Sequence, residues 1–124
     1  MVDGTKKPKV LIVDDTPENI QVLMGTLKDQ YALVAAINGE KALKMALADP
    51  QPDVILLDIM MPAMDGFEVC RRLKADTATR DIPVIFLSAL DDTGNKVKGF
   101  SLGAVDYISK PFQPEEVHVR VNTH

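Results

Sequence analysis

Three short runs of consecutive apolar residues constrain this sequence more than any other feature. They are KVLIVD at Lys9–Asp14, DVILLD at Asp53–Asp58 and PVIFLS at Pro83–Ser88. Because the apolar residues are continuous rather than alternating, each run is typical of a strand covered by helices on both faces. Two weaker runs, Tyr31–Ala36 and Ala104–Ile108, raise the count to five. Amphipathic stretches separate the runs, so the sequence predicts an α/β fold with a doubly wound, five-stranded parallel sheet.

Helix signals lie between these runs. Pro17 follows Thr16 and suits the first turn of a helix, and apolar residues then recur at helical spacing. Asn38-Gly39 opens a stretch rich in Ala and Leu, and the segment from Gly66 to Lys74 has one apolar face. Cys70 lies on that face, which predicts a buried structural thiol.

The last two helices have weaker signals. The segment from Asp91 to Leu102 contains Gly94 and Gly99. Each interior glycine costs a helix roughly 0.5–1 kcal/mol relative to alanine, so we expect this helix to be marginal. Pro114 and the acids after it suit a helix start, but three later valines alternate with polar residues as in a strand. Strand–helix alternation favours a helix, which reaches His124 with no stop signal, as if cut from a longer protein.

Length and composition limit the class of protein. A chain of 124 residues is expected to form one domain, with residues 1–8 as a flexible leader and residues 9–124 as the folded part. The net charge of −4 and the lack of a basic stripe argue against direct nucleic-acid binding. A single cysteine excludes an internal disulfide and fits a reducing compartment. With neither a stretch of about 18 apolar residues nor a secretion signal, we expect a cytoplasmic protein without a membrane span.

Polar residues fall where the predicted strands end. Asp14-Asp15 closes the first run, Asp58 and Ser88 close two others, and Lys110 follows the last. In a parallel sheet the carboxyl ends of all strands lie along one edge, and ligands bind outside that edge. These residues are therefore predicted to share one site.

Three carboxylates in one site require cations. Two unit charges 4 Å apart repel by about 1 kcal/mol in water and by about 4 kcal/mol at an effective dielectric of 20. Lys110 supplies one positive charge, and a divalent metal is the natural second. Oxygen ligands in a small hydrated site suit Mg²⁺. A carboxylate nucleophile, a metal, a lysine and a hydroxyl together fit phosphoryl transfer.

Four motifs in this order resemble one family. They are Val13-Asp14-Asp15, the segment LDIMMPAMDG at Leu57–Gly66, Leu87-Ser88-Ala89 and SKPF at Ser109–Phe112. The chain resembles the receiver domain of bacterial two-component response regulators from Lys9 to its C-terminus. The resemblance implies a flavodoxin-like (βα)5 fold with strand order 2-1-3-4-5, which is known for chemotaxis response regulators and does not follow from the periodicity.

The resemblance also implies the roles of the acidic residues. Asp58 would be the phosphoacceptor. Asp14 and Asp15 would bind Mg²⁺ together with Asp58 and the backbone carbonyl of Met60.

Three further residues gain roles from the same resemblance. Ser88 would hydrogen-bond the phosphoryl group, and Lys110 would form an ion pair with it. The peptide bond between Lys110 and Pro111 would be cis, as it is in relatives. Tyr107 matches the aromatic residue that changes rotamer when the hydroxyl residue moves. The implied partners are a histidine kinase or phosphotransfer protein, and an output domain or a partner protein that responds. A second copy could bind through the fourth helix, fifth strand and fifth helix.

Met60 and Leu90 lie two residues beyond Asp58 and Ser88, at positions that tune phosphoaspartate hydrolysis in relatives. Both are apolar here, so neither can orient an attacking water. We therefore expect a long-lived phosphoryl group.

Two other functions are compatible with parts of the pattern. A Mg²⁺-dependent phosphohydrolase could also use Asp58 as its nucleophile, but the dehalogenase-like phosphatases need a carboxylate two residues later, where Met60 stands. A pseudo-receiver would bind partners through a silent pocket, but such relatives lose the acidic pair, the acceptor or the lysine. We expect a chain that promotes only its own phosphorylation and dephosphorylation and is not an enzyme on other substrates.

Simpler roles remain open for several of these residues. Asp14-Asp15 could cap the helix that begins at Pro17. Tyr107 could be a half-buried core residue with its hydroxyl in water. Gly66 is expected to adopt a backbone conformation that other residues avoid.

Overall fold

The computed structural model describes residues 7–89 and 93–124. Five parallel strands form one sheet in the order β2-β1-β3-β4-β5, which confirms the expected fold. The strands are β1 (Lys9–Val13), β2 (Ala32–Ala36), β3 (Val54–Asp58), β4 (Val84–Ala89) and β5 (Asp106–Lys110). The last strand begins and ends two residues later than the run Ala104–Ile108 suggested, so Lys110 is its final residue rather than a residue beyond its end.

Helices connect the strands in strict alternation. They are α1 (Pro17–Leu27), α2 (Gly39–Leu47), α3 (Gly66–Ala75), α4 (Thr93–Ser101) and α5 (Pro114–Thr123). The helix predicted after Pro114 is confirmed over the strand alternative. Val117 and Val121, one helical turn apart, are buried, whereas Val119 is exposed. Asp91, where the fourth helix was predicted to begin, and residues 1–6 of the predicted leader lie outside the described residues.

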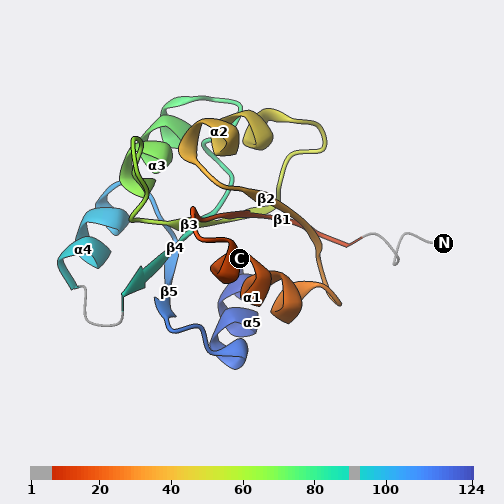
Figure 1. Cartoon of the computed structure of the whole chain (residues 1–124). Helices are drawn as coiled ribbons and strands as arrows, with labels where there is room; N and C mark the ends of the chain where they lie inside the picture. Colours follow the sequence, from red (N-terminus) through yellow and green to blue (C-terminus); the bar gives the residue numbers. More distant parts are fainter. Residues whose placement is uncertain (1–6, 90–92) are drawn as a thin grey trace.

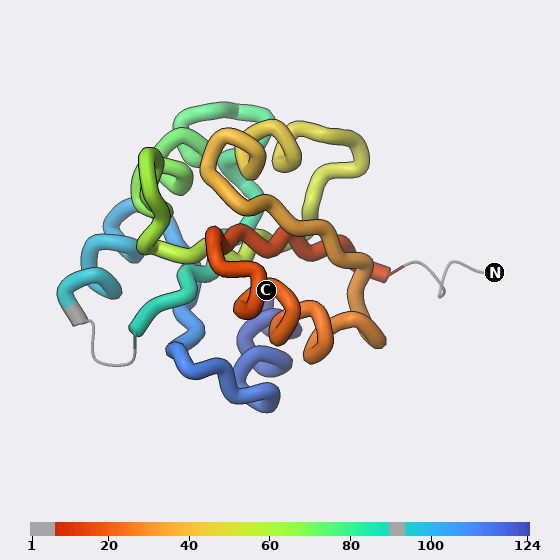
Figure 2. Tube along the Cα trace, in the orientation of Figure 1, coloured from red at the N-terminus to blue at the C-terminus, as the bar shows by residue number. Residues whose placement is uncertain are grey.

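Helices cover the sheet on both faces (Figure 1). One apolar cluster joins the sheet to α1 and α5, and a second joins it to α2 and α3. Helices α1 and α5, at opposite ends of the chain, lie side by side (Figure 2). The central strands β1, β3 and β4 are almost wholly buried, which explains their continuous apolar sequences. Within the described residues, none of the helices has the length and apolar character needed to cross a membrane.

The cap of α3 places the helix directly after the loop that follows β3. The carboxylate of Asp65 accepts a hydrogen bond from the backbone N–H of Glu68 at 2.9 Å. Cys70 on the same helix is fully buried, and burial raises the pKa of its thiol, as expected for a structural cysteine.

Loss of this cap should have a measurable cost. Asp65→Ala is expected to lower the free energy of unfolding by about 1 kcal/mol, because one orphan N–H of the first turn loses its acceptor. Thr16 is the matched control, since it occupies the cap position of α1 without a side-chain hydrogen bond. Chemical denaturation of both alanine variants checks this, and an equal loss in the two would contradict it.

Candidate functional site

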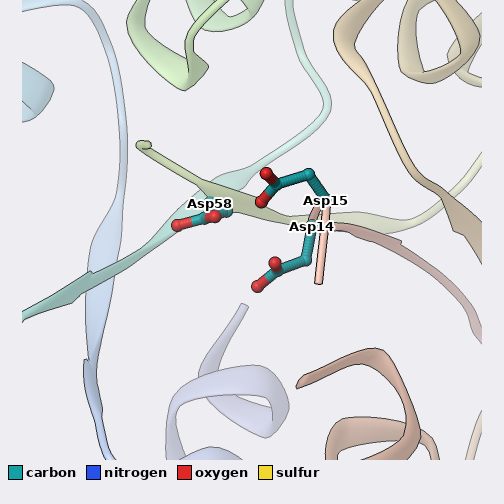
Figure 3. Close-up of side chains that lie close together, drawn as sticks. All are labelled: Asp14, Asp15 and Asp58. Carbon is teal, nitrogen blue, oxygen red and sulfur yellow. The ribbon is translucent and has the colours of Figure 1, made fainter. Parts of the chain in front are cut away.

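Three carboxylates gather at the carboxyl ends of β1 and β3. The two strands are neighbours, with Val13 paired to Leu57, so the residues that follow Val13 lie beside Asp58. One carboxylate oxygen from each of Asp14, Asp15 and Asp58 lies within 4.8 Å of the others. Figure 3 shows the three side chains projecting from these two strand ends toward a common region. The predicted convergence is therefore present.

Local hydrogen bonds hold Asp14 in place. Its side chain is fully buried, and its two oxygens accept hydrogen bonds from the backbone N–H of Thr16 at 2.9 Å and the amide of Asn19 at 3.2 Å. The residue that caps α1 is Thr16. The suggestion that Asp14 or Asp15 caps α1 is therefore wrong, and Asp14 instead supports the turn before this helix while facing the acidic cluster. Asn19 was missed by the sequence analysis, because no motif marks it.

Lys110 reaches this cluster from β5. Its ammonium lies 2.9 Å from Oδ1 of Asp58 and 3.9 Å from Oδ2 of Asp14. Strand β4 separates β3 from β5, so the long lysine side chain spans the width of one strand to make these contacts. Lys110 therefore shares one sheet edge with the carboxylates, as its position after the last apolar run predicted.

The surroundings of Asp58 disfavour the ionised form of its carboxyl group. It is 3% exposed. Burial raises the pKa of the Asp58 carboxyl, and the nearby Asp14 charge raises it further, while hydrogen bonds from Lys110 and the backbone of Met60 act in the opposite direction. The net shift is upward. One lysine therefore does not offset the cost of ionising this carboxylate, and the site favours additional positive charge.

A cavity of about 100 Å³ lies directly over Asp58. Its lining includes Met60, Ser88, Asn95 and Lys110 as well as Asp58 itself. Ser88 is buried one residue before the end of β4, next to the strand end where its position predicted it. Asn95, from α4, was not identified from the sequence, where nothing distinguishes it from other polar helix residues. We call this space the acceptor cavity.

The expected backbone role of Gly66 is wrong. Gly66 is the first residue of α3 and does not have a positive φ, whereas Ala63 in the preceding loop does, at 68°. Glycine is required at position 66 for space, because an added Cβ would overlap the backbone carbonyl of Asp58. The loop before α3 thus folds back tightly against the acceptor residue.

Tyr107 does not have its hydroxyl in water. The side chain is 5% exposed, and its oxygen lies within hydrogen-bonding distance of backbone carbonyls in α4. The reading of Tyr107 as a core residue with a solvated hydroxyl is therefore wrong. Of the two positions thought to tune hydrolysis, Met60 is 74% exposed, and Leu90 lies outside the described residues.

The acidic cluster fits a small divalent cation. Oxygen ligands of one octahedral Mg²⁺ lie roughly 3–4 Å from one another, and the three carboxylate oxygens all lie within 4.8 Å of one another. The donor set of Asp14, Asp15 and Asp58 could therefore hold a metal.

Comparison with known proteins decides the family. The profile of the response regulator receiver domain matches residues 10–122. This chain belongs to the response regulator receiver family. The receiver is 45% identical over 116 residues to the response regulator PleD of Caulobacter vibrioides, covering 93% of this chain and 25% of PleD. It is 44% identical over 115 residues to RpaA of Synechocystis sp., a DNA-binding transcriptional regulator, covering 92% of this chain and 47% of RpaA.

Solved structures agree with the fold. The receiver superposes on the chemotaxis protein CheY4 of Vibrio cholerae with a TM-score of 0.87 and 31% identity, covering 94% of this chain and 98% of that one. The receiver spans between a quarter and half of the length of the relatives PleD and RpaA. A receiver of a response regulator interacts with histidine kinases as part of a two-component system.

Proposed function

We propose that this receiver accepts a phosphoryl group on Asp58. The observation that carries the proposal is the ammonium of Lys110, 2.9 Å from Asp58 Oδ1, beside two further carboxylates at the same sheet edge. The donor is a phosphohistidine of a partner kinase or phosphotransfer protein. A carboxylate oxygen of Asp58 attacks phosphorus, the phosphorus–nitrogen bond of the donor breaks, and the histidine leaves with the bonding pair.

The residues around the acceptor cavity have distinct roles in this step. Lys110 pairs with the negative charge of the phosphoryl oxygens, and the hydroxyl of Ser88 donates a hydrogen bond to one of them. Asp14, Asp15, Asp58 and the backbone carbonyl of Met60 would hold Mg²⁺. A bound Mg²⁺ would offset the charge shared by the carboxylates and the phosphoryl group. Tyr107 and Ser88 then change position together, which alters the surface that partners contact.

Intact mass measures this function directly. The receiver incubated with Mg²⁺ and acetyl phosphate should gain the mass of one phosphoryl group, and chelation of the metal should prevent the gain. Asp58→Asn should gain nothing, whereas Asp29→Asn, which changes an exposed turn residue, should behave as wild type. A wild-type chain that never gains the phosphoryl mass would instead favour a pseudo-receiver.

We also propose that the receiver acts on no separate substrate. The position two residues after Asp58 carries Met60, which cannot serve as the acid or base of a phosphohydrolase. The relatives PleD and RpaA are longer than this chain, and the name of RpaA describes a DNA-binding transcriptional regulator, so this proposal concerns the receiver alone. Turnover of a simple phosphomonoester that disappears in Asp58→Ala would contradict this proposal.

The lifetime of the phosphoryl group is expected to be long. Met60 lines the acceptor cavity and is 74% exposed, so an asparagine there would have both room and water within reach. Met60→Asn should accelerate dephosphorylation several-fold, because its amide can orient an attacking water. Loss of the phosphoryl mass over time, after removal of the donor, gives both rates. Equal rates would discard the idea.

We propose the α4–β5–α5 surface as the contact for an output domain or a second copy. It exposes the apolar side chains of Val97, Phe100 and Val119. Beside them, Arg120 of α5 pairs with Asp106 of β5 at 3.1 Å. Sedimentation of the phosphorylated receiver tests the second copy: Val119→Asp should abolish any dimer, whereas Val22→Asp, at another exposed valine on α1, should not. The cytoplasmic location remains a prediction from the sequence.

A further inference from the structure

The two glycines of α4 have very different surroundings. A Cβ on Gly94 would meet nothing within 4 Å. A Cβ on Gly99 would overlap the hydroxyl of Tyr107 and would lie 2.8 and 2.9 Å from two ring carbons of Phe86. Real Cβ atoms do not approach carbon so closely, so a side chain at position 99 and the observed position of Tyr107 exclude one another.

The hydroxyl of Tyr107 fills the space left by Gly99. It lies 2.6 Å from the carbonyl oxygen of Asn95 and 2.7 Å from that of Lys96. The ring packs between Phe86, at a centroid distance of 5.8 Å, and Phe100, at 5.0 Å. We call this arrangement the tyrosine seat; it consists of Gly99, the two α4 carbonyls and the Phe86 ring.

One turn of α4 connects the tyrosine seat to the acceptor cavity. Asn95 lines that cavity together with Asp58 and Ser88. Gly99 follows Asn95 by four residues, so both lie on the same face of α4. A movement of α4 at Asn95 therefore changes the carbonyl that the hydroxyl of Tyr107 contacts.

We propose that Gly99 is the positioning residue that holds Tyr107 beneath α4, and that the turn from Asn95 to Gly99 links this seat to the acceptor cavity. The link rests on the proposed function, since the phosphoryl group would form in that cavity. A side chain at position 99 either rotates Tyr107 outward or lifts α4, and each response exposes the phenol.

Nitration of tyrosine by tetranitromethane tests the seat in the whole chain without Mg²⁺ or phosphodonor. In Gly99→Ala, Tyr107 should react about tenfold faster than in wild type, because its protection depends on local packing. Gly94→Ala, on the same helix, should match wild type. Tyr31 is the internal reference, because it is 8% exposed and belongs to the apolar cluster on the other face of the sheet.

The proposal would be wrong if Tyr107 in a folded Gly99→Ala variant is nitrated as slowly as in wild type. It would also be wrong if Gly94→Ala accelerates nitration of Tyr107 as much as Gly99→Ala does. If Tyr31 also reacts quickly, the variant has unfolded, and thermal unfolding of the double variant Gly99→Ala/Tyr107→Phe decides instead. Removing the hydroxyl removes the worst overlap, so the cost of Gly99→Ala should be smaller in the Tyr107→Phe background. An equal cost in both backgrounds would reject the proposal.

A second arm adds acetyl phosphate and Mg²⁺. Phosphorylated wild type should show a changed nitration rate at Tyr107, and Gly99→Ala should show little further change. An unchanged nitration rate of Tyr107 in phosphorylated wild type would contradict the proposed coupling between the acceptor cavity and the tyrosine seat. If intact mass records no phosphoryl group at all, the proposed function is wrong. The nitration experiment without Mg²⁺ still tests the tyrosine seat in that case.

Discussion

Gly66→Ala is expected to lower the free energy of unfolding by about 3 kcal/mol. The added Cβ would overlap the carbonyl oxygen of Asp58 and lie 2.9 Å from the Cα of Ile59. Both are backbone atoms at the end of a central strand, so no flexible side chain can move aside. The backbone N–H of Gly66 also donates to the carbonyl of Ile59 at 2.9 Å, which draws the start of α3 onto the strand end.

Relief of this overlap has to move the acceptor or the helix. Either movement disturbs the 2.9 Å contact between Lys110 and Asp58, so phosphorylation by acetyl phosphate should slow as well. Denaturant unfolding followed by circular dichroism measures the stability change.

Gly25→Ala is the matched control for this substitution. Gly25 is an exposed residue inside α1, and a Cβ there would meet nothing within 4 Å. Alanine should stabilise that helix by about 0.5–1 kcal/mol, because the unfolded chain loses freedom and the folded chain gains no clash. Wild-type stability in Gly66→Ala would show that the close approach at the strand end is not a real constraint.

Asp58→Asn should raise the melting temperature of the metal-free receiver by about 4 °C at neutral pH. The pKa of Asp58 is raised because burial and the Asp14 charge together outweigh the hydrogen bonds from Lys110 and Met60. The ionised carboxylate therefore costs folding free energy, and an amide removes that cost. Asp29→Asn is the matched control on an exposed turn.

The pH dependence follows from the same shift. Between the pKa of an unfolded aspartate and the raised pKa of Asp58, the folded state binds more protons than the unfolded state. Stability contributed by this group is therefore present at low pH and is lost as the pH rises through that window. Asp58→Asn should remove this loss from the stability curve, whereas Asp29→Asn should retain it.

Magnesium should reverse the order of the two proteins. A cation that binds only the folded state stabilises it by an amount that grows with the logarithm of its concentration divided by its Kd, and the three-carboxylate cluster exists only in the folded state. Wild type should therefore gain more from Mg²⁺ than Asp58→Asn does. A melting temperature that is the same for both proteins, with and without Mg²⁺, would contradict both the raised pKa and the metal site.

The strands and the site edge were predictable because their signals are local. A continuous apolar run reports burial on both faces, and the residue that ends such a run must lie at the sheet edge. Asp14, Asp58 and Ser88 could be placed on this basis alone. The helix after Pro114 was harder, because its valines fit two periods, and it was resolved by the burial of Val117 and Val121 against the core.

Other features depend on distances between segments far apart in the chain. The room at Gly66 is set by how closely α3 returns to β3, and the room at Gly99 by how α4 rests on β4 and β5. Asn95 lines the acceptor cavity only because α4 packs there. Residue order and periodicity were enough to place the carboxylates and the lysine on one edge. Packing between helices and sheet was needed to give the cavity its walls and Tyr107 its partners, because those contacts join surfaces that no local pattern describes.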